Sequence, residues 1–357
     1  MTTHHNPLWT QPLVRGMLAC CVGLATTALL AVSQWNQAQA VAHTRFTQSA
    51  DALTEALTRH LDSYLGITYG LRDLFVANPA LGRREFMEAA ERLNLATRHP
   101  EIKNLAFTRY VTAQDKATFE QHVRADTSVH PEGYPQFAIR PPGMRQEYFV
   151  ADYLWPMEGN QGVHGLDISA QPANLASMRY SQSSGQPVAS GPFDLLQENA
   201  HRTGFVIRVP VFRQGAGATS PQPDSGNFLG AVAVTLRIWD IMERMRADGR
   251  LQGLGLYLSD RGADYAGQNF AVNIPLFISA TPYDSTVLAA YQRDLPVFGR
   301  KWRVEVNPTE SFLSPSEQQL PWWLAVGGTL LSALLGWATF RWTRQHSTRH
   351  PDDAPKP

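Results

Sequence analysis

PWWLAVGGTLLSALLGWATF, residues 321–340, is an uninterrupted run of uncharged residues. An α-helix needs about 20 predominantly apolar residues to cross the hydrocarbon core of a bilayer. Trp322, Trp323, Trp337 and Trp342 lie near the two ends of this run, at the depth where tryptophan is enriched in membrane proteins. The stretch therefore predicts a transmembrane helix, which anchors the rest of the chain to a membrane.

A second uncharged run, residues 16–35, lies near the N-terminus. Arg15 precedes it, and Arg341, Arg344 and Arg349 follow the C-terminal run. Positively charged flanks prefer the cytoplasm. We therefore expect a two-pass protein of the plasma (inner) membrane, with both termini in the cytoplasm and the central domain extracytoplasmic, which means periplasmic in a bacterium.

An alternative interpretation of the first run is a cleaved signal peptide. Ala38-Gln39-Ala40 matches the small-residue pattern of a cleavage site. The site lies some distance beyond the apolar run, which favours a retained helix.

Composition narrows the possible functions of the central domain. Charged residues make up 17% of the chain and the formal net charge is zero, so nothing suggests nucleic acid as a partner. The two cysteines, Cys20 and Cys21, both lie in the first apolar run. This placement excludes disulfides, thiolate zinc sites and cysteine nucleophiles from the central domain.

Both apolar runs carry small residues at every fourth position, a spacing that permits close helix packing in lipid. These residues are Ala19, Gly23 and Thr27 in the first run, and Gly328, Ser332 and Gly336 in the second. The pattern predicts a packed helical bundle surrounded by membrane lipid, and it is compatible with a homodimer.

A helical stretch without proline or glycine follows the first run, from about Gln37 to Leu65. Apolar residues recur at steps of three and four, which is the spacing of one helix face; they include Phe46, Leu53 and Leu57. Two interpretations stay open: a helix packed on its own domain, or a stalk that pairs across a dimer. Asn78-Pro79 is expected to end the helix.

The remaining domain alternates helical and strand-like segments. Helices are expected over residues 83–97, 167–182 and 237–248. Strands are expected over residues 102–111, 136–140, 147–154, 188–196, 204–212 and 229–236, and in the stretches 253–260, 274–280 and 296–306. Residues 213–227 read as a long hairpin loop. The order predicts an α+β fold with two subdomains.

Several stretches together resemble the CHASE sensory family. They are IKNLAFTRYVTAQDKATFEQHV (102–123), the run from Tyr148-Phe149-Val150 through Leu154-Trp155-Pro156 to Gly165-Leu166-Asp167, and GQPVASGPFDLLQE (185–198) followed by GFVIRVPVF (204–212). Their order and spacing agree with the family over roughly residues 83–240, and so does the pair of flanking apolar runs.

The resemblance implies a long stalk helix and two PAS-like subdomains, with a ligand in the membrane-distal one. The expected segments are a cytoplasmic N-terminus 1–15, a transmembrane helix 16–35, a stalk 36–78, a distal subdomain 79–249, a proximal subdomain 250–320, a transmembrane helix 321–340 and a cytoplasmic tail 341–357.

The resemblance also implies site residues. Plant members bind adenine-type cytokinins, and the position that contacts the adenine ring matches Asp167; a backbone contact would fall at Ala189. Asp167 is equally suited to cap the following helix, whose first turn would contain Pro172. Ala189 could be a small core residue. Phe107, Tyr110, Phe149 and Tyr153 could line the pocket or simply form core.

No catalytic or cofactor motif is present in the sequence. It lacks G-x-S-x-G, H-E-x-x-H and a P-loop. Histidines 99, 122, 130, 164 and 201 are scattered without metal-like spacing, although His164 precedes Asp167 by three residues. We expect a non-enzyme with no cofactor and no metal; a small His164/Asp167 site is the weakest alternative.

CHASE proteins usually continue into a histidine kinase or a nucleotide cyclase, and no such motif follows Phe340. We therefore expect a sensor of a small molecule that signals to a separate cytoplasmic partner. Two alternatives stay open: a membrane scaffold or envelope-complex subunit that binds protein, and the sensor half of a truncated kinase or diguanylate cyclase.

Overall fold

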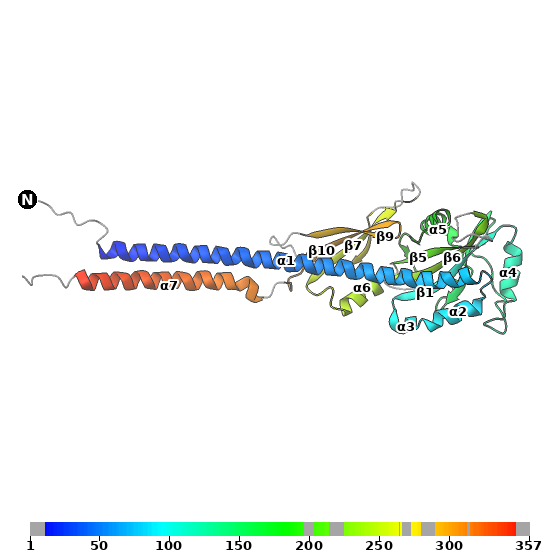
Figure 1. Ribbon diagram of the computed structural model, residues 1–357, viewed down its shortest axis with the longest axis horizontal. Coiled ribbons are helices and arrows are strands. Elements are labelled where there is room, and N and C mark those ends of the chain that lie inside the picture. Colours follow the sequence, from blue (N-terminus) through cyan, green and yellow to red (C-terminus); the bar gives the residue numbers. More distant parts are fainter. Residues whose placement is uncertain are drawn as a thin grey trace, which may run out of the picture. The chain divides into compact units, whose positions relative to one another are not determined.

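The computed structural model describes residues 11–195, 203–213, 225–263, 265, 273–279, 290–312 and 315–347. The chain divides into two compact parts. The helical part contains the residues before Ser49 and those after Asn307, and the sheet part contains Ser49–Tyr283 and Ala290–Asn307 (Figure 1).

The α-helices of the described residues vary widely in length. They are α1 (Pro12–Ala77), α2 (Arg83–Arg92), α3 (Leu95–Arg98), α4 (Lys116–Arg124), α5 (Pro172–Ser184), α6 (Ile238–Ala247) and α7 (Pro315–Ser347). Short 3-10 turns cover Ile168–Ala170 and Ser225–Asn227.

The strands form two antiparallel sheets. The first contains β1 (Ile102–Thr112), β2 (Glu147–Trp155), β3 (Val188–Ala189), β4 (Phe193–Asp194), β5 (Thr203–Phe212) and β6 (Phe228–Arg237). The second contains β7 (Leu254–Ala263), β8 (Ile274–Ile278), β9 (Tyr291–Val297) and β10 (Arg300–Pro308).

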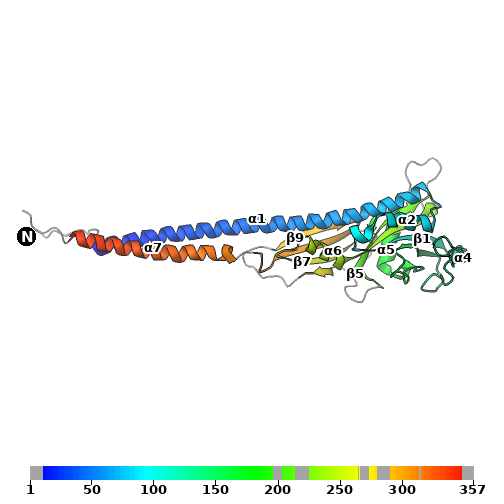
Figure 2. The ribbon, with the colours of Figure 1, turned by 90° about the horizontal axis from the view of Figure 1, so that it is seen from below.

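In the helical part, the N-terminal half of α1 packs against α7 through small residues (Figures 1 and 2). A Cβ added at Gly23 would come within 2.7 Å of the Ser332 hydroxyl, and one at Gly328 within 2.3 Å of Thr27. Only glycine permits this approach. The predicted close packing is confirmed, and it occurs within one chain; Cys20, rather than Ala19, is the residue that faces Gly336.

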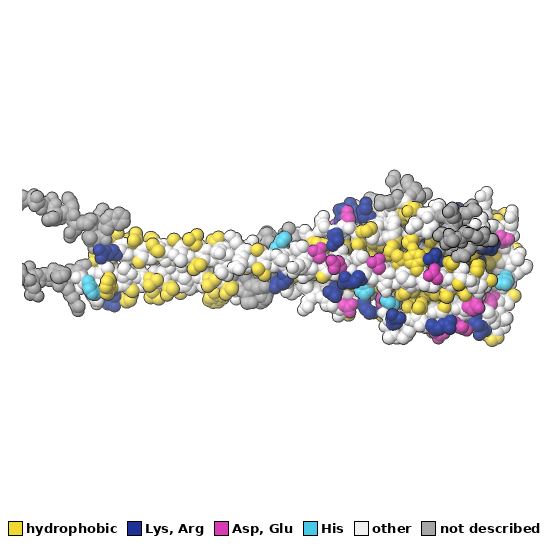
Figure 3. Space-filling view, viewed as in Figure 1, with side chains coloured by type: hydrophobic (Ala, Val, Ile, Leu, Met, Phe, Trp, Pro, Cys, Tyr) yellow, Lys and Arg dark blue, Asp and Glu magenta, His cyan; other side chains and the backbone are white. Residues whose placement is uncertain are grey.

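Both helices are long and apolar enough to cross a membrane. Their large apolar side chains are mostly exposed, for example Leu29 at 72% and Trp322 at 69%. Figure 3 shows hydrophobic side chains along these helices, whereas charged side chains gather on the sheet part. The two apolar helices fit a two-pass membrane protein.

The C-terminal half of α1 is buried against its own domain. Leu53 and Leu57 are at most 2% exposed, and so are Tyr64 and Leu71. The first interpretation of the apolar stripe, a helix packed on its own domain, is confirmed for these residues. Leu53 and Leu57 therefore offer no surface for pairing with another stalk. The helix ends at Ala77, directly before Asn78-Pro79 as predicted.

The first sheet has the strand order β2-β1-β6-β5-β3, with β4 also paired to β5. Helix α2 and the end of α1 cover one face, where Phe75 stacks on Phe107 with ring centroids 4.2 Å apart. Helix α5 covers the other face (Figure 1). Because both faces are covered, β5 is buried at every residue after Thr203.

The second sheet has the order β8-β7-β10-β9. Strand β10 alternates strictly between buried and less buried residues, the pattern of a strand with one packed face. The predicted fold class is thus confirmed: an α+β fold with a long N-terminal helix, two PAS-like antiparallel sheets and two flanking apolar helices.

Some predicted elements are wrong in detail. The helix over residues 83–97 breaks at Asn94, which adopts a left-handed conformation (φ 50°) between α2 and α3. The strand over 136–140 is a loop with one isolated bridge at Arg140. The helix over 167–182 begins instead as a 3-10 turn and continues as α5.

Two predicted strands are divided. The strand over 188–196 consists of the two-residue strands β3 and β4, because Ser190-Gly191-Pro192 interrupts it. The stretch 296–306 is a hairpin that turns at Phe298 and Gly299, both with positive φ. Strands β5 and β6 pair antiparallel, as expected for a hairpin; most of its predicted loop lies outside the described residues.

Candidate functional site

A partly open cavity of about 60 Å³ lies on the α5 side of the first sheet. Its floor consists of side chains that share one face of four neighbouring strands: Asn104, Ala106 and Thr108 of β1, Ala151 of β2, Val206 and Arg208 of β5, and Ala233 and Thr235 of β6. The small alanines leave room above the sheet. The cavity is therefore a consequence of residue size at same-face positions.

The register of the strands places the polar floor residues. Asn104 pairs with Thr235, which pairs with Val206; in the next row, Ala106 pairs with Ala233, which pairs with Arg208. Asn104 and Arg208 thus lie two strands apart and two residues apart along the strands, which places their backbones roughly 12 Å from each other at the usual spacings.

The opposite wall is the segment 163–171 together with the first turn of α5. Val163, Leu166, Ile168, Gln171 and Asn174 line the cavity, and Phe193, Asp194 and Leu195 line it from β4. An apolar enclosure with a few polar groups is the usual character of a small-molecule site.

Asp167 holds this wall in place. Its buried carboxylate accepts hydrogen bonds from Phe149 N at 3.0 Å and Ser169 N at 3.1 Å, and from the Ser169 hydroxyl at 2.6 Å. Arg145 Nε lies 3.3 Å from Oδ2. Asp167 is a cap, but of the 3-10 turn Ile168–Ala170, to which the Ser169 N–H belongs; the N-cap of α5, whose first residue is Pro172, is Gln171. A direct ligand contact by Asp167 stays a prediction.

The turn at Gly165-Leu166-Asp167 needs a glycine at its first position. Its φ is +83°, and a Cβ there would lie 2.6 Å from the Ala138 carbonyl oxygen. Only glycine fits this backbone conformation and close approach. The turn places Leu166 on the cavity wall and Asp167 beneath it.

Arg208 is the most unusual residue of the cavity. It is 2% exposed, and its guanidinium donates to the Asn174 carbonyl at 2.9 Å, the Asn174 Oδ1 at 3.0 Å and the Ser177 hydroxyl. Its Nε has no hydrogen-bond partner. Within the part of the chain that the structure describes, no carboxylate lies at ion-pair distance. Burial accordingly lowers the pKa of Arg208 to about 10, with only Tyr265 opposing the shift.

Asn104 is a second unsatisfied group on the cavity floor. It is 2% exposed, and its Nδ2 donates to Asn160 Oδ1 at 3.0 Å. Asn160 directs its own amide N–H groups at backbone carbonyls, including that of Pro156 at 3.0 Å, which fixes the orientation of both amides. The Oδ1 of Asn104 is left buried without a donor.

Ala189 joins the two sheets. Its backbone N–H donates to the Phe298 carbonyl at 2.9 Å, and its carbonyl accepts from the Tyr265 hydroxyl at 3.2 Å. Tyr265 in turn accepts from Arg300 NH1 at 3.3 Å. Both backbone groups of Ala189 are therefore engaged inside the protein, and its role as a ligand contact stays a prediction.

The contact between the two sheets at Ala189, which we call the joint, contains a second buried arginine. Arg300 is 3% exposed; its Nε and NH2 lie 2.9 and 2.8 Å from Asp260 Oδ2. The other oxygen of Asp260 accepts from Gly262 N at 2.8 Å. This cation has a dedicated carboxylate partner.

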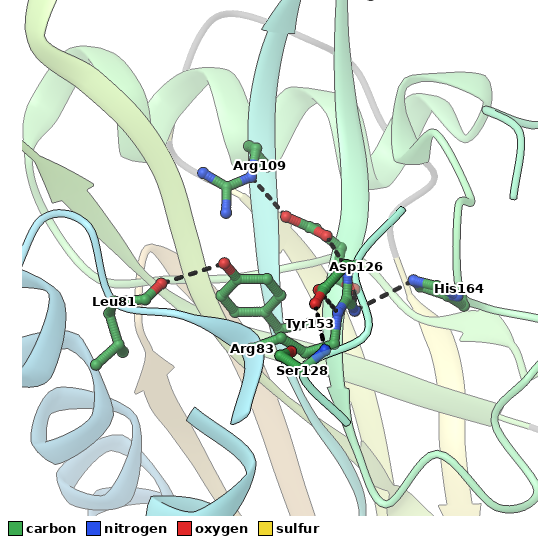
Figure 4. A network of polar contacts seen from close by, with 8 residues as sticks. Leu81, Arg83, Arg109, Asp126, Ser128, Tyr153 and His164 are labelled. Atoms are coloured by element: carbon green, nitrogen blue, oxygen red, sulfur yellow. Dashed lines mark hydrogen bonds and ion pairs between the residues drawn. The ribbon is translucent and has the colours of Figure 1, made fainter. Parts of the chain in front are cut away.

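A polar network covers the opposite face of the first sheet (Figure 4). Arg83 is 2% exposed and pairs with Asp152 at 2.8 Å and Asp126 at 2.9 Å; its NH1 lies 3.3 Å from His164 Nε2. Burial and then the charge of Arg83 lower the pKa of His164 to about 4. His164 therefore belongs with Arg83, and no contact joins it to Asp167.

The predicted aromatic residues lie outside the wall of the cavity. Phe107 and Tyr153 face α1 and α2 on the opposite side of the sheet, where Tyr153 donates to the Leu81 carbonyl at 3.1 Å. Tyr110 and Phe149 belong to an apolar cluster with Ile168 and neighbouring residues. All four stay predictions as ligand contacts.

The sequence analysis missed Arg208, Asn104 and Asn174. A signal was available for Arg208: it is the charged residue in the otherwise uncharged run GFVIRVPVF. A charge inside a buried strand needs a partner, and that requirement marks the position. Among the described residues, no group of three or more His, Cys, Asp or Glu side chains could hold a metal ion.

Comparison with solved structures gives distant similarities. An extracellular ligand-binding receptor from Desulfohalobium retbaense DSM5692 is 15% identical, with a TM-score of 0.39; the match covers 73% of this chain and 39% of that one. The ligand-binding domain of the Pseudomonas aeruginosa PAO1 amino-acid chemoreceptor PctC, in complex with GABA, is 10% identical over 74% and 98% of the two chains, with a TM-score of 0.38.

A third solved structure, methyl-accepting chemotaxis protein X, is 13% identical over 76% of this chain and 98% of that chain, with a TM-score of 0.44. No curated protein is similar enough in sequence to count as a relative.

The sequence model of the CHASE domain matches residues 79–270, more than half of the chain. The matched region contains the complete first sheet, α5, the segment with Asp167 and the cavity with Arg208. The protein therefore belongs to the CHASE domain family, and its CHASE domain is a sensory domain of the extracellular type.

Proposed function

We propose that this protein is a two-pass membrane sensor whose CHASE domain binds a small molecule in the cavity between the first sheet and the segment 163–171. The observation that carries the proposal is a pair of buried polar atoms without partners, Arg208 Nε and Asn104 Oδ1, both on residues that line this enclosure. Leaving such atoms unsatisfied costs about 1–3 kcal/mol each, a cost that a ligand would remove.

The proposed orientation follows from charge. The arginines that flank the apolar runs, Arg15 on one side and Arg341 and Arg344 on the other, favour the cytoplasm for both termini. The CHASE domain then lies outside the cytoplasm, as the family implies. The subdomain limits 79–249 and 250–320 belong to this proposal.

The proposed signal passes from the cavity through the joint at Ala189 to the second sheet, and through the two spans to a cytoplasmic partner. Strand β3 supports this route, because Ala189 pairs with Ile207 of β5 and also donates to Phe298 of the second sheet. A ligand can drive such a change only by binding one conformation more tightly than another. A homodimer in the membrane is part of the proposal.

Asp167 is proposed to act through the wall that it holds. For its carboxylate to contact a ligand directly, it would have to release Ser169 or Arg145. Tyr110 and Phe149 support the wall through their contacts in the cluster with Ile168.

The test is a ligand screen on the full chain in lipid nanodiscs, read out by thermal unfolding. Purines and cytokinins, which the family resemblance suggests, are screened with amino acids, peptides and short carboxylates. A ligand at 100 times its Kd should stabilise by about 2.7 kcal/mol, which raises the melting temperature by several degrees at about 2–4 °C per kcal/mol.

The variant Ala233→Leu fills the centre of the cavity floor and should abolish the shift. Ala96→Leu, at an exposed position of α3, is the matched control and should retain it. A screen without any binder, or a binder that Ala233→Leu holds as tightly as the wild type, would contradict the proposal; in that case a protein partner becomes the better candidate.

A further inference from the structure

The cavity contains a positive charge without a counter-charge. Among the described residues, the guanidinium of Arg208 contacts only neutral acceptors, which are the Asn174 carbonyl, the Asn174 amide oxygen and the Ser177 hydroxyl. A buried cation normally pairs with a carboxylate, because neutral hydrogen bonds do not replace its hydration. The two other buried arginines of the described residues, Arg83 and Arg300, both have carboxylate partners.

The position of Arg208 distinguishes it from a tolerated core residue. It lines the cavity, and its unused donor, Nε, is completely buried. The first turn of α5 lines the same space through Gln171 and Asn174, and the N-terminal end of a helix favours negative charge. Asp194 at the rim is exposed and forms no ion pair with Arg208.

The size of the cavity limits the ligand. One water-sized sphere needs about 10–15 Å³ by this measure, so a space of about 60 Å³ accommodates a molecule of only a few non-hydrogen atoms. A purine offers no negative charge for Arg208. The buried Oδ1 of Asn104 requires a hydrogen-bond donor on the same ligand.

We propose that the cavity binds a small hydroxy- or amino-carboxylic acid, whose carboxylate pairs with Arg208 and whose hydroxyl or ammonium group donates to Asn104. The inference rests on the proposed sensor function and specifies its ligand class. An arginine and a carboxylate form the strongest hydrogen-bonded pair available to side chains, and the ligand supplies the counter-charge that the protein omits.

The experiment is calorimetric titration of the full chain in nanodiscs, in a carboxylate-free buffer of constant ionic strength. Acetate and glycolate are each compared with the corresponding amide, and L-alanine supplies the ammonium case. Glycolate should bind at least about tenfold more tightly than glycolamide, since a charged hydrogen bond exceeds a neutral one. Glycolate and L-alanine should both bind more tightly than acetate, because acetate has no group that can donate to Asn104.

Variants assign the two contacts. Arg208→Met should abolish glycolate binding, and Arg208→Lys should weaken it without abolishing it. Asn104→Leu should reduce glycolate to the affinity of acetate. Arg303→Met is the matched control, because it removes an exposed arginine of β10 that pairs with Asp294; it should bind glycolate like the wild type.

Two results overturn the inference: glycolamide binding as tightly as glycolate, or glycolate binding unchanged in both Arg208 variants. Failure of the inference is distinguishable from failure of the sensor function. If no carboxylate binds but another compound of the broad screen binds and is lost in Ala233→Leu, the ligand class is wrong and the sensor stands. If neither set binds, both are wrong.

Discussion

Arg300 in the second sheet and Arg208 in the first are both buried arginines on β-strands, at 3% and 2% exposure. Arg300 has two nitrogens within 3 Å of Asp260 Oδ2. Within the described ranges, Arg208 has only neutral acceptors and a buried Nε without a partner. The charge of the buried arginine is thus compensated by a carboxylate in the second sheet, and by neutral hydrogen-bond acceptors alone, among the described residues, in the first.

The difference in pairing indicates different roles for the two arginines: a structural role for Arg300 and a ligand-binding role for Arg208. A paired buried arginine is neutralised within the protein, so it can support packing at the joint with Ala189. An unpaired one lowers stability, and natural sequences keep such residues where function requires them. The cavity of the first sheet is therefore prepared for an anion, and the contact between the sheets at Ala189 is complete without one.

The largest expected effect comes from breaking the complete pair. Asp260→Asn leaves Arg300 buried without a negative charge, which typically costs about 3–5 kcal/mol. We expect a correspondingly lower urea midpoint for the full chain. Asp294→Asn in the exposed pair with Arg303 is the control and should cost at most about 1 kcal/mol. If both variants lost the same unfolding free energy, the buried Arg300–Asp260 pair would be no more important for stability than the exposed pair.

A third buried arginine, Arg83, makes the stability of the protein depend on pH through the neighbouring His164. It donates to His164, whose pKa falls from 6.5 to about 4 through burial and then the charge of Arg83. Because the folded pKa lies below the unfolded one, the unfolded chain binds more protons between these values. Stability is therefore complete above pH about 6.5 and falls as the pH drops, by about 3 kcal/mol at pH 4.

His164→Gln keeps a neutral acceptor for Arg83 and should remove this part of the acid sensitivity. The measurement is the urea midpoint of each protein at pH 7 and pH 4. His43→Gln, at an exposed position, should behave like the wild type. If His164→Gln lost as much stability between the two pH values as the wild type, His164 would titrate normally.

The smallest expected effect comes from adding a carboxylate beside Arg208 instead of removing the one beside Arg300. Asn174→Asp is nearly isosteric and places a carboxylate 3.0 Å from Arg208 NH2, where the amide oxygen now lies. The buried arginine of the first sheet is then paired with a carboxylate, like Arg300 in the second sheet. The Asn174 Nδ2 now donates to Gln171 Oε1, so the Gln171 amide has to turn its N–H groups toward the new carboxylate. With that adjustment we expect a gain of about 1 kcal/mol in the unfolding free energy, since hydrogen bonds between charged groups exceed neutral ones by about this amount.

The same variant should bind glycolate at least about tenfold more weakly, because the internal carboxylate occupies the guanidinium. Asn36→Asp on an exposed position of α1 should change stability by less than about 0.5 kcal/mol. A destabilised Asn174→Asp that still binds glycolate would contradict the assignment of Arg208 as the anion contact.

Much of the fold was predictable because its signals are local. The two apolar runs identify themselves by composition, and Asn78-Pro79 marks the end of α1 through backbone sterics. Two of the wrong predictions depend on positive φ. Asn94 and Phe298 turn the chain where neither residue requires it, so the broken helix and the β9–β10 hairpin were not visible in the local pattern.

The sequence by itself determined the two long apolar helices, the α+β order of elements and the resemblance to the CHASE family, because apolar length, periodicity and motif order are properties of consecutive residues. Only the tertiary structure decided that Asp167 anchors a wall and that Arg208 lacks a counter-charge. Both depend on which distant groups come together: Phe149 N reaches Asp167, and Asp260 reaches Arg300 but no described carboxylate reaches Arg208. Burial and pairing are properties of the folded chain, and they decide where a charge is available for a ligand.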